Sequence, residues 1–393
     1  MQLSILIPAR NEMWLNKTIE DILKNSEAET EVIVGLDGQW GTEPIPQHPR
    51  VTVVYYPESI GQRAMTNRLC SLSKAKYVMK VDAHCAFDKG FDKKLIEDMD
   101  DNWTVVPAMK NLHVFDWVCE CGFRKYQGPT IPCPKCGKEM KRDIKWYAKP
   151  SPYSTSYRFN NQLEFKYFGE YKAKQKGDIV DTMSLQGSCF MLTREKYLEL
   201  DICDESWGSW GGQGAEVAIK TWLSGGEVKV NKKTWYAHLF RTQGGDFGFP
   251  YPNPGSEQKK AKNTLRDTFL NDKWDKAVRP LSWIVDKFSP VPDWNTKGII
   301  FYTDNQLNLK IAHKVQKKLR KTGLPITSTS LKPMPHFGNN IVVKGKRGIE
   351  TYYKQIITAL ENVKEDIVYF CEHDVLYNHS HFEFTPPEKD KFY

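Results

Sequence analysis

The first 110 residues alternate between short apolar runs and amphipathic segments, and this alternation limits the fold more than any other feature of the chain. The spacing of apolar residues predicts strands at 3–9, 31–37, 51–56 and 77–83, and helices at 13–25 and 61–74. Strands that alternate with helices form a parallel sheet, and its ligand crevice lies at the carboxyl ends of the strands. We therefore expect an α/β fold with a Rossmann-like sheet.

The length of 393 residues exceeds one average core and suits two domains plus an insertion. Lys, Pro and Cys interrupt the α/β pattern at 113–150, which we interpret as an insertion into a first domain at 1–270. The Trp- and Pro-bearing residues 271–295 are expected to form a linker. A strand at GIIFYTD then opens a second, smaller α/β segment at 296–393.

The composition is that of a globular protein, with 40% hydrophobic and 26% charged residues. The sequence has no apolar run near the roughly 20 residues of a membrane helix and does not start like a signal peptide. We therefore expect an intracellular protein without a membrane partner. The net charge of +8 permits a polyanionic partner without demonstrating one, and the sequence leaves the oligomeric state open.

The stretch VMKVDAHCAF, at residues 78–87, ends a predicted strand with Asp82 and His84. Alternate residues of an extended chain share a face, so both side chains can reach one cation at the mouth of the sheet. A divalent cation there would neutralise a diphosphate leaving group. The plainer alternative is a helix-capping aspartate beside a hydrogen-bonded histidine.

A second informative stretch, WGSWGGQGAEVAIKTWLSGGEVKVNKKTWYAHLFR, occupies residues 207–241. It predicts a Gly-rich loop, a helix, a Gly-Gly turn and a strand that ends at His238.

Together, VDAHCAF and WGGQGAEVAIKTWLSGGEVKV…AHLFR resemble the paired signatures of family-2-like GT-A glycosyltransferases, most closely the polypeptide N-acetylgalactosaminyltransferases. The resemblance covers about residues 1–250 without the insertion. It implies a GT-A fold and transfer of a sugar from a UDP-sugar to an acceptor hydroxyl. It also implies that Asp82, His84 and His238 hold Mn²⁺ or Mg²⁺ against the donor diphosphate.

The same resemblance extends to IPARNE and GQRAMTNR, and Asp37 matches a carboxylate near the nucleoside. It implies that the donor is bound by Pro8, Ala9, Arg10, Glu12, Asp37, Arg63 and Asn67. Thr66 stands where the family has an arginine, which leaves Arg63 or Arg68 for the phosphate contact. Asp37 has a second interpretation, as a turn former before Gly38.

Gln213 and Gly214 stand where inverting relatives carry a Glu-Asp pair whose Asp deprotonates the acceptor. Without that carboxylate the usual general base is missing, so we expect a retaining enzyme. The expected catalytic residues are Gln213, Trp210 and Glu216. Glu216 is either the substitute base or a structural anchor of the loop, and Trp210 either stacks on a sugar or closes a hydrophobic loop.

Four cysteines, Cys119, Cys121, Cys133 and Cys136, form a CxC and CxxC pair within the insertion. Such knuckles predict a tetrahedral structural Zn²⁺, with His113 as a spare ligand and no open position for catalysis.

The insertion also carries basic residues at 124, 125, 135, 138, 141, 142 and 145, interleaved with aromatic ones. This pattern suits a nucleic-acid acceptor such as DNA with a hydroxylated base. The alternative is a protein or small saccharide acceptor, with the lysines keeping a loop soluble.

In the C-terminal segment, Glu372, His373 and Asp374 resemble the acidic strand-end motif of a second GT-A-like domain. We expect either a docking module or a fragment of a longer bifunctional enzyme.

Two other functions stay open for the whole chain. One is an inactive GT-A domain that serves as a zinc-containing scaffold or nucleic-acid-binding protein. The other is a nucleotidyltransferase, whose Gly-rich phosphate loop is missing after the first strand.

Overall fold

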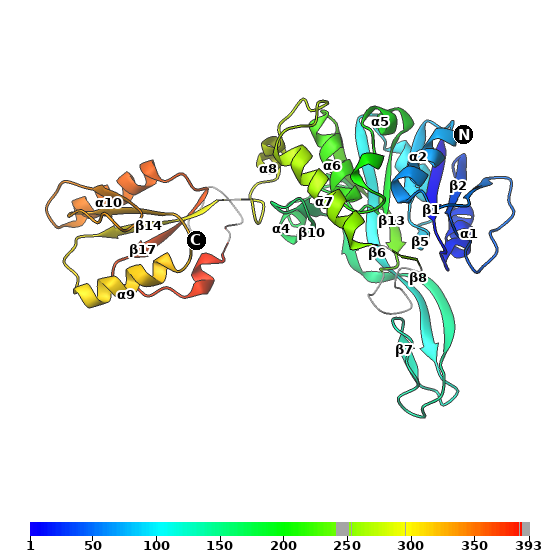
Figure 1. Ribbon diagram of the computed structural model, residues 1–393, viewed down its shortest axis with the longest axis horizontal. Coiled ribbons are helices and arrows are strands. Elements are labelled where there is room, and N and C mark those ends of the chain that lie inside the picture. The colour runs from blue at the N-terminus through cyan, green and yellow to red at the C-terminus, as the bar shows by residue number, and fades with distance from the viewer. Residues whose placement is uncertain (241–250, 253, 295, 385, 387–393) are drawn as a thin grey trace. The chain divides into compact units, whose positions relative to one another are not determined.

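The computed structural model describes the chain except residues 241–250, 253, 295, 385 and 387–393. It divides into two compact units, Met1–Phe288 and Ser289–Tyr393, which are described separately below. The first unit contains both sequence signatures, and the second contains the C-terminal α/β segment (Figure 1).

One large mixed sheet forms the centre of the first unit. Its path runs β11 (Ile179–Asp181), β13 (Glu227–His238), β6 (Trp103–Val118), β12 (Cys189–Thr193), β4 (Tyr77–Val81), β1 (Leu3–Ala9), β2 (Thr30–Asp37) and β3 (Val51–Tyr56). The last four of these strands are parallel, and β12 runs antiparallel to β4. The expected parallel α/β half is therefore present, and its strands end at one edge.

Helices follow the parallel strands as their apolar spacing predicts. In α1 (Leu15–Asn25) the buried residues include Leu15, Ile19 and Ile22, which share one helical face. Helix α2 (Gln62–Leu72) packs on β1 and β2. The remaining helices of this unit are α3 (Phe91–Glu97), α4 (Gly169–Lys172), α5 (Arg194–Glu199), α6 (Gln213–Leu223), α7 (Gly255–Leu270) and α8 (Leu281–Phe288), with a short 3-10 helix at Glu205–Trp207.

The expected linker at 271–295 contains α8, which belongs to the first unit. Trp283 and Phe288 of this helix lie on the buried Trp222 of α6, with ring centroids 5.9 and 5.6 Å apart. Large apolar side chains hold the segment against the core, so the boundary between the units falls after Phe288 and not at 270.

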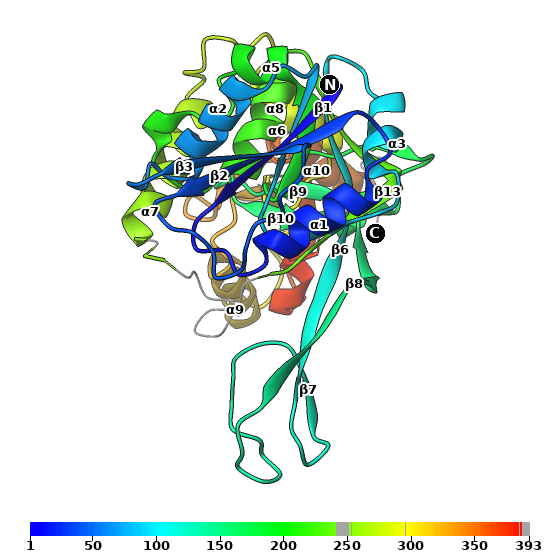
Figure 2. The same ribbon diagram turned by 90° about the vertical axis from the view of Figure 1, so that its right-hand side faces the viewer.

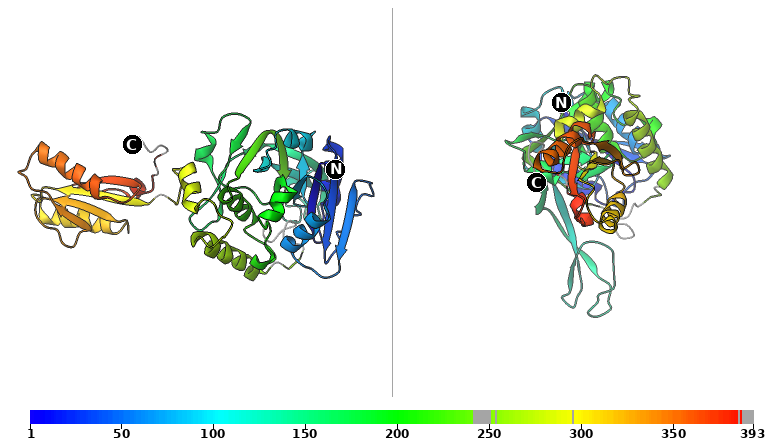
Figure 3. Two further views of the ribbon diagram at one scale, coloured as in Figure 1. Left: turned by 90° about the horizontal axis from the view of Figure 1, so that it is seen from above. Right: turned by 90° about the vertical axis from the view of Figure 1, so that its left-hand side faces the viewer.

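The predicted insertion is a long hairpin of β6 and β8 (Lys141–Ser154), with the short strand β7 (Arg124–Tyr126) near its tip. It extends well beyond the body of the first unit (Figures 1 and 2 and the right-hand view of Figure 3). At its base Trp14 of the loop before α1 packs on Phe115 and Trp146. The indole N–H of Trp146 also donates to Asp21 over 3.0 Å, so the base of the hairpin is fixed to α1.

Two smaller pairings complete the first unit. Strand β5 (Cys85–Phe87) joins the end of β13, and β9 (Tyr157–Phe159) pairs with β10 (Phe165–Tyr167).

The second unit is a four-stranded parallel sheet. Its order is β16 (Asn339–Val342), β15 (Ile326–Ser330), β14 (Lys297–Thr303) and β17 (Ile367–Glu372), with a 3-10 helix at His379–Phe382. Helix α9 (Leu309–Arg320) packs on one face, and α10 (Ile349–Asn362) covers the other (Figure 1). The strand predicted at GIIFYTD is present as β14, and the strand end predicted at residues 372–374 is the end of β17.

No helix in the described parts of the chain combines the length and apolar character needed to cross a membrane.

Candidate active site

Three side chains from two distant stretches meet where β4 and β13 end and β5 begins. Asp82 and His84 lie between β4 and β5, and the antiparallel pairing of β13 with β5 places His238 opposite Cys85. Nε2 of His238 lies 3.2 Å from Oδ2 of Asp82, and Nε2 of His84 lies 4.0 Å from the same oxygen. The three potential ligand atoms are all within 4.8 Å of one another. The residues predicted to bind the metal are therefore brought together.

The surroundings of these side chains suit a divalent cation. Glu12 Oε2 lies 3.5 Å from Nδ1 of His84, which makes no hydrogen bond to the described residues, so the carboxylate is near enough to attract this ring nitrogen. Nδ1 of His238 is buried without a hydrogen-bond partner among the described residues. One carboxylate and two imidazoles are ligands that Mn²⁺ and related ions accept.

The protonation states also suit metal binding. Burial lowers the pKa of His238 to about 4, although its hydrogen bond to Asp82 acts in the opposite direction, so the imidazole is neutral at pH 7. Burial opposes ionisation of Asp82, but the charge of Lys80 and the hydrogen bond from His238 outweigh it and hold the pKa of Asp82 well below its usual range. A neutral imidazole and an ionised carboxylate are the forms that bind cations.

A cavity of about 650 Å³ lies in front of these three side chains. Five of the residues predicted to bind the donor line it, namely Pro8, Ala9, Arg10, Glu12 and Asp37. Asp37 accepts hydrogen bonds from the backbone N–H groups of Ile60 (2.6 Å) and Gly61 (3.1 Å) and from Oγ of Ser59 (2.8 Å). Asp37 thus faces the cavity, and its carboxylate holds the loop before α2. This bracing of residues 59–61 differs from the predicted role of a turn former before Gly38, and the contact with the donor stays a prediction.

A second cavity of about 540 Å³ adjoins the first. Gln62, Asp82, Trp210 and His238 line both, so the candidate metal site stands on the boundary between them. Trp210 and Gln213, two of the predicted catalytic residues, line this second cavity. The two cavities therefore meet at the candidate metal site.

Glu216 lines neither cavity. Its carboxylate is fully buried and contacts the guanidinium of Arg63 and, at 2.9 Å, Nζ of Lys220. Its other hydrogen bond comes from the backbone N–H of Asp204, at 3.2 Å. This geometry favours the structural one of the two roles left open for Glu216, because a general base must reach the acceptor hydroxyl.

Arg63 and Asn67 also differ in position from the expectation that they bind the donor. The guanidinium of Arg63 is buried against Glu216 and the carbonyl oxygen of Gly211. The amide of Asn67 donates to the carbonyl oxygen of Cys203 and to Glu205, at 3.1 and 3.0 Å. Arg63 thus ties α2 to the Gly-rich loop and to α6, and Asn67 ties α2 to residues 203–205, which precede that loop.

Gly214 contacts the backbone before β12 so closely that no side chain fits there. A Cβ atom at this position would lie 2.3 Å from the carbonyl oxygen of Leu185 and 2.8 Å from the amide nitrogen of Gly187. Gln213 beside it directs its amide to Sγ of Cys203. The structure therefore has no carboxylate at the two positions where inverting relatives carry one.

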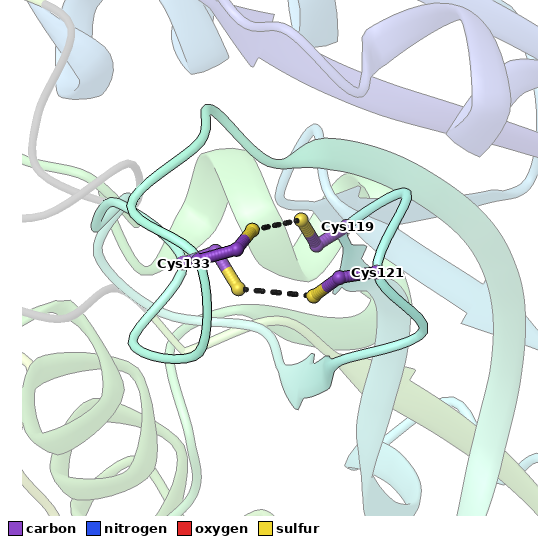
Figure 4. Close-up of side chains that lie close together, drawn as sticks. Cys119, Cys121 and Cys133 are labelled. Atoms are coloured by element: carbon purple, nitrogen blue, oxygen red, sulfur yellow. Dashed lines mark hydrogen bonds between the residues drawn. The ribbon is translucent and has the colours of Figure 1, made fainter.

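The four cysteines of the hairpin gather at its tip. Sγ of Cys119 lies 3.4 Å from Sγ of Cys136, and Sγ of Cys121 lies 3.5 Å from Sγ of Cys133 (Figure 4). All four sulfur atoms are within 4.8 Å of one another. A tetrahedral zinc with Zn–S bonds of about 2.3 Å separates its sulfurs by about 3.8 Å. The predicted cysteine cluster is thus compatible with a zinc site.

His113, the predicted spare ligand, lies away from this cluster. Its Nε2 contacts Asp116 at 2.8 Å and its Nδ1 contacts the hydroxyl of Tyr147 at 2.7 Å. The ring is occupied by partners on the hairpin strands and is not one of the clustered groups.

Part of the basic charge of the hairpin is paired within the hairpin itself. Arg124 and Lys145 both contact Asp143, and Lys138 lies 3.1 Å from Glu120. These pairs are exposed, so they are weak and can exchange for other anions.

In the second unit, Glu372, His373 and Asp374 line a cavity of about 320 Å³ at the carboxyl end of the sheet. Glu372 accepts from the hydroxyl of Tyr302 at 3.2 Å, and His373 contacts Oγ1 of Thr303 at 2.6 Å. Among the described residues this trio does not form a cluster of potential metal ligands.

Sequence reasoning missed Lys80, which is 1% exposed and contacts Oδ1 of Asp82. It also missed Glu257, which accepts from the backbone N–H of Ser209 at 2.7 Å and lines the first cavity. The signal for Lys80 was present, because it is the single charged residue in the strand YVMKV. Arg241, which ends the second signature, lies outside the described residues.

Residues 4–116 match Glycosyl transferase family 2. The mouse and human polypeptide N-acetylgalactosaminyltransferase 3 are each 23% identical over 288 residues, which cover 67% of this chain and 40% of theirs. A putative polypeptide N-acetylgalactosaminyltransferase 13 of Drosophila melanogaster is 24% identical over 226 residues, 56% of this chain and 34% of that protein. The predicted resemblance is confirmed, although the chain spans only about two fifths or less of the length of these relatives.

The fold comparison agrees with the sequence comparison. A crystal structure of GalNAc-T7 with UDP, GalNAc and Mn²⁺ matches with a TM-score of 0.50 and 16% identity. The match covers 69% of this chain and 49% of GalNAc-T7. The predicted GT-A fold is confirmed, and the relatives of this chain are glycosyltransferases.

Proposed function

We propose that the chain is a metal-dependent glycosyltransferase that takes a sugar from a UDP-sugar donor. The observation that carries the proposal is the convergence of Asp82, His84 and His238 at the boundary of two adjoining cavities. The crystal structure of GalNAc-T7 with UDP and Mn²⁺ supports this choice of cofactor and donor.

In the proposed reaction Asp82, His84 and His238 hold a divalent cation, and Glu12 orients His84. The cation, when bound, offsets the charge of the departing diphosphate. The residues of the first cavity, with Asp37 bracing the loop before α2, bind the nucleotide. Trp210 packs between the two cavities and keeps the sugar in line with an acceptor hydroxyl, which lowers the entropic cost of the encounter.

A donor screen tests this proposal. The protein is incubated with a panel of nucleotide sugars and Mn²⁺, and slow release of nucleoside diphosphate is followed with and without EDTA. We expect release from one UDP-sugar and its loss on chelation. Release that continues unchanged in EDTA would contradict the metal-dependent mechanism.

We further propose that transfer retains the anomeric configuration. Gln213 and Gly214 offer no carboxylate at the position of the inverting base, and the close packing of Gly214 leaves no room for one. NMR of the first-formed product decides between the two outcomes, and an inverted anomer would exclude retention.

The cysteine-tipped hairpin is proposed to bind a structural zinc and to recognise the acceptor. Its exposed aromatic side chains, Tyr126 and Tyr147, stand among its lysines, which suits a chain of phosphates with bases or sugars. The exposed ion pairs at Asp143 and Glu120 neutralise part of this basic charge, and a protein or saccharide acceptor is the alternative. Transfer assays with DNA that carries a hydroxylated base and with hydroxyl-bearing peptides distinguish the two acceptors.

A further inference from the structure

Lys80 is a buried ammonium group in direct contact with the candidate metal site. Its side chain is 1% exposed, and its Nζ contacts Oδ1 of Asp82 and donates to the carbonyl oxygen of Gly187 over 2.8 Å. Nothing in the geometry requires a cation to anchor β4, since the four other residues of that strand are apolar or aromatic. A buried charge is costly, so its position beside Asp82 calls for a functional explanation.

The two oxygens of Asp82 have different partners. Oδ1 contacts Lys80, whereas Oδ2 faces His238 at 3.2 Å and His84 at 4.0 Å. Lys80 therefore leaves Asp82 one oxygen for a cation. It also offsets the negative charge of Asp82, which is itself one of the potential ligands.

This charge balance has opposite effects on a cation and on a diphosphate. Lys80 repels a divalent cation that binds alone, and it attracts an anion in the adjoining cavities, one of which it lines. At an effective dielectric constant of about 20, a unit charge about 10 Å away changes a binding constant by roughly tenfold.

We propose that Lys80 makes the site selective for the metal–nucleotide pair over the metal alone. The free protein then holds the cation weakly, and the negative charge that is missing from the site is supplied by the diphosphate of the nucleotide. This inference rests on the proposed function, because it takes a nucleoside diphosphate as the occupant of the first cavity. It assigns Lys80 as a positioning and selectivity residue that acts through charge.

Two binding titrations on the full chain test the proposal, with Mn²⁺ and UDP as probes. Mn²⁺ is titrated without nucleotide by electron paramagnetic resonance, and UDP is titrated calorimetrically in EDTA. In Lys80→Met and Lys80→Gln we expect Mn²⁺ to bind about tenfold tighter and UDP about tenfold weaker than in the wild type. Gln keeps a donor for Gly187, so agreement between the two variants assigns the effect to charge.

The opposite signs of the two changes distinguish charge from simple damage. If both affinities fall together in the variants, or if neither changes, the proposal is wrong. Lys229→Gln is the matched control, because Lys229 is also largely buried and lies 2.6 Å from the carboxylate of Asp181, away from both cavities. It should change neither titration. A wild-type protein that binds no UDP even with Mn²⁺ would contradict the proposed function itself.

Discussion

At the residue scale, the arrangement of Asp82 and His238 predicts that enzymatic turnover requires both side chains. Asp82→Asn and His238→Ala should each lower the turnover of nucleoside diphosphate release by about a hundredfold or more, because a principal electrostatic stabiliser is lost. Mn²⁺ binding should weaken in parallel. His113→Ala is the matched control, since His113 also pairs with a carboxylate, at 2.8 Å, but lies on the hairpin. Turnover near that of the wild type in either site variant would refute the metal assignment.

Glu216 is a second residue whose role can be decided by substitution. Glu216→Gln leaves Arg63 and Lys220 as buried cations without their carboxylate, so we expect a loss of about 3 kcal/mol in the free energy of unfolding. Urea denaturation measures it. Glu199→Gln, which breaks an exposed pair with Lys196, should lose far less. A variant that keeps its stability but loses turnover would restore Glu216 as the catalytic base.

The same carboxylate predicts a pH dependence. Burial opposes ionisation of Glu216, but the charges of Arg63 and Lys220 outweigh it and hold the pKa of Glu216 below its ordinary value of 4.5. A lowered pKa in the folded state stabilises the protein above the unfolded pKa, and this contribution is lost as the pH falls through the folded pKa. Unfolding measured below pH 4.5 should therefore show a steeper acid loss in the wild type than in Glu216→Gln.

At the scale of the element, the hairpin should depend on its metal. We expect one zinc per chain by elemental analysis, and its loss in Cys121→Ser or Cys133→Ser. Chelation should speed amide hydrogen exchange in residues 113–150 more than in the central sheet, because the metal would link the two loops of the hairpin tip that carry the cysteines. Cys371→Ala, a buried cysteine of the second unit, is the control and should keep its zinc. Protein without zinc and with four titratable thiols at the tip would contradict the assignment.

Elements with strong periodicity could be predicted from the sequence, and those fixed by distant contacts could not. The run LSILIPA and the helix after it follow local apolar spacing. The Trp and Pro residues of 271–295 favour a linker, but the segment contains α8, which packs on Trp222 and so joins the core. Strand β15, with the sequence ITSTS, lacks an apolar pattern and is nevertheless buried.

The residues of the candidate site also fall into two groups, those that a local pattern predicts and those that only distant contacts bring together. Asp82-x-His84 could be recognised locally, because both residues follow one strand. His238 entered the prediction only through the family resemblance, since no local rule pairs positions 156 residues apart. The ion pair of Arg63 with Glu216 spans 153 residues and was missed for that reason.

At the scale of the whole molecule, the net charge of +8 strengthens the binding of a polyanionic acceptor only if the positive charges are concentrated where that acceptor binds. If the acceptor is DNA, affinity should fall roughly a thousandfold between about 50 and 200 mM salt, because several phosphate contacts release counterions. Fluorescence anisotropy with a labelled DNA duplex measures this affinity at each salt concentration. Lys141→Gln combined with Lys125→Gln on the hairpin should reduce the salt slope, and Lys310→Gln with Lys314→Gln in the second unit is the matched control. An absence of binding at the lower salt would remove DNA from consideration.

The packing around Gly214 also limits the paths by which this chain could change its chemistry. Any side chain there would begin 2.3 Å from the carbonyl oxygen of Leu185, so Gly214→Asp cannot be accepted without displacing the segment before β12. That segment includes Gly187, whose carbonyl oxygen holds Lys80 against Asp82. Placing the acid of inverting relatives at position 214 would therefore disturb the segment that holds Lys80 beside the metal site, so this substitution requires a compensating change in the backbone before β12.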